Sequence, residues 1–64
     1  MDDAEIIDRV DDYWGVVSRG RRYFLRDSQI SNKQHPHVGQ RGLLGYVQRP
    51  ASKMLMFTDS EAPL

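Results

Sequence analysis

A two-residue turn, Arg19-Gly20, divides the most regular part of this chain into two β-rich runs. The runs cover residues 13–18 and 21–26, and both are rich in the β-branched and aromatic residues that favour extended backbone. Two such runs separated by two residues, one of them glycine, predict a β-hairpin, because glycine readily adopts the left-handed backbone of tight hairpin turns. In a chain of 64 residues, this hairpin makes up a large part of a single small domain.

A second hairpin is expected near the C-terminus. Residues 43–49 and 53–58 are again β-rich, and Pro50 has the backbone angle that the first central position of a turn requires. Residues 27–42 are rich in turn-forming and amide side chains, which predicts a loop, and residues 59–64 are expected to be a flexible tail.

The N-terminal segment, about residues 3–12, is expected to be a short helix. Its apolar residues recur at helical spacing, aspartates lie between them, and Gly15 follows where a helix could end. The apolar stripe consists of Ile6, Ile7, Val10, Tyr13 and Trp14. The expected fold class is therefore α+β but mostly β, in one domain over residues 1–58. A short helix would be followed by two antiparallel hairpins that form a small curved sheet or partial barrel, OB-like or SH3-like.

The formal net charge of zero hides a strong segregation of charge along the chain. Residues 1–12 carry six carboxylates and one arginine, a net charge of −5, whereas residues 13–53 carry eight cations and one carboxylate, a net charge of +7. Such asymmetry predicts either a polyanionic partner or an acidic segment that folds over a basic body. Simple mutual neutralisation, which keeps the chain soluble, is the alternative.

Several classes of protein are not expected from this sequence. Cysteine is absent, which excludes disulfides and thiolate zinc sites, and His35-Pro36-His37 alone is incomplete as a zinc site. No nucleophile elbow, phosphate loop or dinucleotide fingerprint is present, so we expect neither an enzyme nor a bound cofactor. No signal peptide or membrane-spanning run is found, which favours a soluble cytoplasmic protein.

The strand expected over residues 21–26 carries the sharpest functional signal. Alternation places Tyr23 and Leu25 on one face, and Arg22, Phe24 and Arg26 on the other. Arginine forks match phosphate oxygens, and exposed rings offer surfaces on which bases can stack. The alternative is that Phe24 belongs to the core, with the aliphatic stems of the arginines packed around it.

A nucleic-acid-binding surface would draw on basic and aromatic residues along the chain. The candidates are Arg19, Arg21, Arg22, Phe24, Arg26, Arg41, Tyr46, Arg49 and Lys53, with Trp14 as a further stacking platform.

Three motifs in this chain resemble, in their order, the cold-shock group of OB-type small β-barrels. They are Trp14-Gly15-Val16-Val17, then the run from Arg22 to Ile30, and then Val38-Gly39-Gln40-Arg41. In that family a Gly-x-Val strand, an aromatic strand ending in Ser-x-Ile and a Val-Gly strand entry follow one another. The resemblance covers about half the chain, and the family's second aromatic strand, Lys-Gly-Phe-Gly-Phe, has no counterpart here. The resemblance to this group implies a barrel that binds nucleic acid.

Two functions are therefore predicted. The first is a small non-enzymatic domain that binds nucleic acid, expected to be single-stranded, on a basic and aromatic sheet face. The alternative is a protein-interaction or inhibitor module, in a homodimer or with another protein. Such a module would use the acidic helix or an exposed strand edge, because the two C-terminal strands carry apolar residues on both faces.

Overall fold

A computed structural model describes residues 1–31, 36–48 and 51–59 and shows one mixed sheet of six strands. The elements are β1 (Asp2–Val10), β2 (Tyr13–Ser18), β3 (Arg21–Leu25), the single-turn 3-10 helix η1 (Asp27–Gln29), β4 (Ile30–Ser31), β5 (Arg41–Gln48) and β6 (Lys53–Asp59). The strand order is β3-β2-β1-β5-β6-β4. Neighbouring strands run antiparallel except for the parallel pair β4 and β6.

The prediction of an N-terminal helix is wrong, because this segment forms β1, which lies between β2 and β5 in the sheet. Ala4 and Ile6 are buried, whereas Glu5 between them points to the other face, as strand alternation requires. Isoleucine, valine and aspartate are mediocre helix formers, and an isolated helix of ten residues is marginal in water. The backbone hydrogen bonds that β1 makes with two neighbouring strands stabilise this segment more than a short isolated helix would. The fold is therefore all β, not α+β.

A β-bulge at Ile7 changes which residues of β1 face outward. Ile6 pairs with Val16, but the next pair is Asp8 with Gly15, so Ile7 is an extra residue. The turn before β5 pairs with β1 just before the bulge, where the Ile6 carbonyl accepts a 2.7 Å hydrogen bond from the Gly39 amide. Gly39 has φ +95°, a conformation that side chains disfavour.

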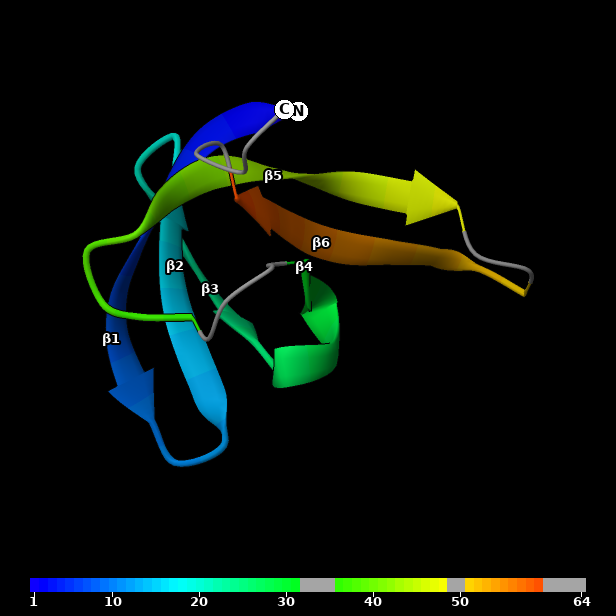
Figure 1. Cartoon of the computed structure of the whole chain (residues 1–64). Coiled ribbons are helices and arrows are strands. Elements are labelled where there is room, and N and C mark those ends of the chain that lie inside the picture. The colour runs from blue at the N-terminus through cyan, green and yellow to red at the C-terminus, as the bar shows by residue number, and fades with distance from the viewer. Residues whose placement is uncertain (32–35, 49–50, 60–64) are drawn as a thin grey trace.

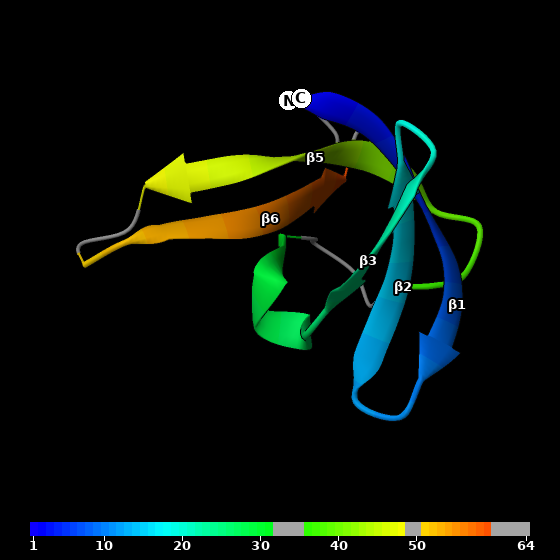
Figure 2. The same cartoon turned by 180° about the vertical axis from the view of Figure 1, so that it is seen from behind.

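The sheet is strongly curled but not closed. Its two edge strands, β3 and β4, follow each other in the chain and are separated by the single turn η1. Figures 1 and 2 show β1, β2 and β3 side by side, β5 and β6 crossing one end of them, and the β5–β6 hairpin projecting away. The open sheet replaces the expected helix and partial barrel.

The segment expected to be a loop over residues 27–42 contains η1, β4 and the first residues of β5. The Gln29 side chain fixes η1, because its Nε2 donates a 3.1 Å hydrogen bond to the Leu55 carbonyl of β6. Its Oε1 accepts a hydrogen bond from the Arg26 amide at 3.1 Å. These contacts bring the end of β3 to β6, which curls the sheet. Asp59, expected in the tail, is the last residue of β6.

The core lies inside the curl, between the inner faces of the strands. Its buried members are Ala4, Ile6, Trp14, Val16, Leu25, Leu44 and Phe57. The ring of Phe57 lies over Gly42, where a Cβ would come within 2.6 Å of the ring, so glycine is needed for this close packing. The inner face is thus filled by side chains, which leaves the outer face of β1, β2 and β3 for function.

Candidate nucleic-acid interface

Two aromatic rings lie on the outer face of β2 and β3. Phe24 is 51% exposed and Tyr13 is 37% exposed, whereas Trp14 and Leu25, their neighbours in sequence, point into the core. Phe24 is therefore a surface residue, and the alternative that it belongs to the core is excluded. The hairpin turn supports this placement, because Arg19 and Gly20 both have positive φ, at 54° and 75°, which sets the register of β2 and β3.

Each exposed ring is accompanied by an arginine. The Arg22 guanidinium carbon lies 5.7 Å from the centre of the Phe24 ring, and that of Arg26 lies 4.9 Å from the centre of the Tyr13 ring. Arg26 also donates a 2.9 Å hydrogen bond to the Tyr13 hydroxyl. Cation–π contacts of this kind hold cations and rings side by side. The outer face thus combines two stacking surfaces with two cations.

Tyr13 was not among the predicted site residues. The signal was present in the alternation of β2, because a buried Trp14 places Tyr13 on the outer face beside the strand that carries Phe24. The helical interpretation of the N-terminal segment instead places Tyr13 in its apolar stripe.

Carboxylates of β1 pair with several of the predicted site arginines. The Arg22–Asp8 distance is 2.6 Å, from Nη2 to Oδ2, and Arg41 Nε lies 3.7 Å from Glu5 Oε1. Arg19 lies 3.8 Å from Asp2. The acidic segment therefore crosses the middle of the basic sheet and neutralises part of it. Half-exposed pairs of this kind contribute about 0–1 kcal/mol each, so they set the charge of the face more than its stability.

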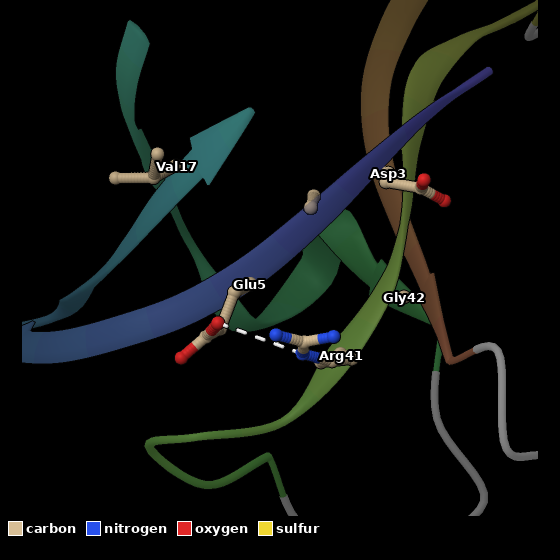
Figure 3. A pocket seen from close by; sticks show the side chains of 6 residues that line it. Asp3, Glu5, Val17, Arg41 and Gly42 are labelled. Carbon is tan, nitrogen blue, oxygen red and sulfur yellow. Dashed lines mark ion pairs between the residues drawn. The ribbon is translucent and has the colours of Figure 1, made fainter. Parts of the chain in front are cut away.

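A depression of about 450 Å³ extends the outer face towards β5. It is lined by Asp3, Ala4, Glu5, Val17, Arg41 and Gly42. Figure 3 shows the Glu5 and Arg41 side chains turned toward each other across β1 and β5, while Asp3 points away from them. Because its charges have both signs, this depression suits a polar group better than an isolated anion.

Trp14 is not a stacking platform, because it is 9% exposed and belongs to the core. Its Nε1 donates a 2.6 Å hydrogen bond to Asp27 Oδ1, and the Arg9 guanidinium lies 4.4 Å from its ring centre. Arg9 also reaches Asp27, at 3.4 Å. This cluster attaches the turn after β3 to β1 and β2, so the role of Trp14 is structural.

The other predicted residues are spread over the molecule. Arg21 and Arg19 lie at the end of the β2–β3 hairpin. Tyr46, 69% exposed, and Lys53 share the opposite face of the sheet from Phe24, on the projecting β5–β6 hairpin. Arg49 lies outside the described residues. The structure therefore brings together Arg22, Phe24 and Arg26, and it adds Tyr13 and Asp8.

In the part of the chain that the structure describes, no three histidine, acidic or cysteine side chains form a group that could hold a metal ion; His35 lies outside this part. The described residues also include no helix that could span a membrane. Comparisons with protein-family models, with curated protein sequences and with solved structures give no match for this chain.

Proposed function

We propose that this chain is a small non-enzymatic domain that binds single-stranded nucleic acid on the outer face of β2 and β3. The observation that carries the proposal is the exposure of Phe24, 51%, with Arg22 against its ring. An aromatic side chain that is half exposed on a sheet face contributes little to the core, so its presence favours a role in binding.

Single strands fit this face better than duplexes. A base of a single strand can unstack from its neighbours and stack on Phe24 or Tyr13, whereas bases inside a duplex are covered on both sides. Of the three motifs that resemble the cold-shock group, the first lies in β2, and the second, which includes Phe24, begins in β3 and runs through η1 to Ile30. A cytoplasmic location stays a prediction, drawn from the lack of a signal-peptide pattern and of a long apolar run in the sequence.

We expect the affinity for a single-stranded oligonucleotide to fall with salt, but less steeply than for a strongly basic domain. Several arginines already contact carboxylates or rings, so about two phosphates should be neutralised, which predicts a log–log slope of about −1.4. Fluorescence anisotropy at several salt concentrations measures the slope. A duplex of the same sequence, as the control, should bind more weakly. Absence of binding at low salt would contradict the proposal.

A second candidate function is protein interaction through the projecting β5–β6 hairpin. The acidic helix expected in this role is the strand β1 instead. Tyr46, however, is 69% exposed on this hairpin, and exposed tyrosines are frequent anchors of protein interfaces. The apolar residues on both faces of these strands have partners within the chain: Leu44 and Phe57 pack in the core, and Met56 is buried on the other face. This reduces the need for a second copy.

If the hairpin mediates dimerisation, sedimentation velocity should show an association that rises with protein concentration at micromolar levels. Replacement of Tyr46 by serine should then weaken the dimer by about tenfold or more, because interface tyrosines often contribute more than 1.4 kcal/mol. Lys53→Ala, which alters the same hairpin without removing an aromatic ring, is the matched control. A strict monomer would exclude self-association through this hairpin and leave only a different protein as its partner.

A further inference from the structure

The Asp8 carboxylate lies in a cradle formed by a glycine. Because of the bulge at Ile7, Asp8 pairs with Gly15 on the outer face, and Gly15 in turn pairs with Phe24 on β3. A Cβ on Gly15 would lie 2.0 Å from Asp8 Oδ1 and 3.1 Å from its Cγ. The carboxylate thus occupies the space that any other residue at position 15 would fill, one strand away from the Phe24 ring.

The two oxygens of this carboxylate have different surroundings. Oδ2 accepts a 2.6 Å hydrogen bond from Arg22 Nη2, whereas Oδ1 is buried and has no donor among the described residues. A buried carboxylate oxygen without a donor is costly, and such exceptions call for an explanation. The Asp8 carboxylate is therefore hydrogen-bonded at Oδ2 and unsatisfied at Oδ1.

We propose that the Arg22 guanidinium is a phosphate site, which the Asp8 carboxylate fills in the free protein. This inference rests on the proposed function and assigns the nucleic-acid phosphate to one side chain. A carboxylate and a phosphate both present oxygens to the guanidinium fork in the same way, so one can replace the other. Because Arg22 also lies over Phe24, a nucleotide whose base stacks on this ring brings its phosphate to the same guanidinium.

The exchange is favourable for two physical reasons. Arg22 is 50% exposed, so a phosphate can reach it from solvent without unfolding any strand. When Asp8 leaves the glycine cradle, Oδ1 becomes hydrated, which offsets part of the lost ion pair. The other arginines of this face keep different contacts, Arg26 with Tyr13 and Arg41 with Glu5, so the exchange is local to Arg22.

Four proteins test the site with a labelled oligothymidylate of about eight nucleotides, a length that suits one small domain. They are the wild type, Asp8→Asn, Gly15→Ala and Glu5→Gln. Asp8→Asn should bind about tenfold more tightly, because it frees Arg22 and removes a carboxylate beside the phosphate. Glu5→Gln removes the same charge from the same face but leaves Arg22 paired, and we expect a gain of about twofold or less.

Gly15→Ala is the most discriminating variant, because it changes no charge. Its methyl group would displace the Asp8 carboxylate, the mobile end of a side chain, whereas the Asp8 backbone oxygen at 3.7 Å leaves room. We expect affinity to rise about threefold, and Asp8→Asn should add less in this background than alone. Circular dichroism melts show which variants are folded.

If Gly15→Ala does not fold, the effect of Asp8→Asn measured in a protein that also carries Arg22→Gln tests the site instead. Arg22→Gln should bind weakly, and Asp8→Asn should give no tenfold gain in this background, because the site it opens is absent. Equal gains from Asp8→Asn and Glu5→Gln, with binding by the wild type, would overturn the phosphate site and leave the proposed function standing. If neither the wild type nor any variant binds, both proposals fail.

Discussion

Replacing Phe57 by alanine should unfold most of this domain at room temperature. Phe57 is fully buried, pairs with Leu44 on the inner face, and its ring lies over Gly42. Truncation of a buried phenylalanine costs about 3–5 kcal/mol, from lost burial and from the cavity that remains. A single core of this size supplies about 3–5 kcal/mol in total, so the loss is comparable with the whole stability.

Urea denaturation followed by circular dichroism measures this effect. The matched control is Phe24→Ala, which removes the same side chain from an exposed position and should lower the free energy of unfolding by less than about 1 kcal/mol. Phe57→Leu, which keeps most of the buried volume, should give a folded but less stable protein. A Phe57→Ala variant with the denaturation midpoint of the wild type would show that Phe57 is not part of the core.

The hairpin of β2 and β3 could be predicted from sequence, whereas the strand state of β1 could not. The hairpin of β2 and β3 depends on adjacent residues and on Arg19-Gly20, so its signal lies within a short window. The strand β1 pairs with β2 across the turn at Asp11 and also with β5, where Glu5 lies opposite Arg41 far along the chain. No pattern inside residues 2–10 contains that information, and helical spacing fitted the same apolar residues.

The candidate site likewise contains some residues that the sequence predicts and others that it does not. Alternation along one strand placed Arg22 and Phe24 on the same face, and the structure places both on the surface. Tyr13 lies on the same face because of the register between β2 and β3. Asp8 lies there only because of the bulge in β1, which no residue type in the sequence indicates. Trp14, a candidate stacking platform by sequence, belongs to the core.

The placement of β1 also changes what the charge segregation means. An acidic helix packed on a basic body would leave the arginines of the outer face available to a polyanion. An acidic strand inside the sheet instead gives Arg22 and Arg41 carboxylate neighbours on the same face. The charges of the outer face therefore largely cancel, and stacking on the rings must supply a large share of the affinity for nucleic acid.

Phe24→Ala should consequently lower the affinity for single strands by about 10- to 100-fold. Stacking of one base on an aromatic ring contributes about 1–3 kcal/mol, and each 1.4 kcal/mol corresponds to tenfold in affinity. The loss should change little with salt, since the variant removes no charge. Arg26→Gln, by contrast, should weaken binding mainly at low salt, because it removes a cation next to Tyr13.

Phe24→Trp is the matched control for this prediction, since it keeps a ring on the outer face and should retain or raise affinity. Anisotropy titrations of all three variants at low and moderate salt separate stacking from charge. If Phe24→Ala binds as tightly as the wild type while it remains folded, base stacking on β3 is excluded. Because Arg22 contacts both the Phe24 ring and Asp8, the same titration with Asp8→Asn shows whether the ring and the phosphate site act on one nucleotide. Cooperation predicts that Asp8→Asn gains less affinity when Phe24 is absent, because no stacked base then holds a phosphate at Arg22.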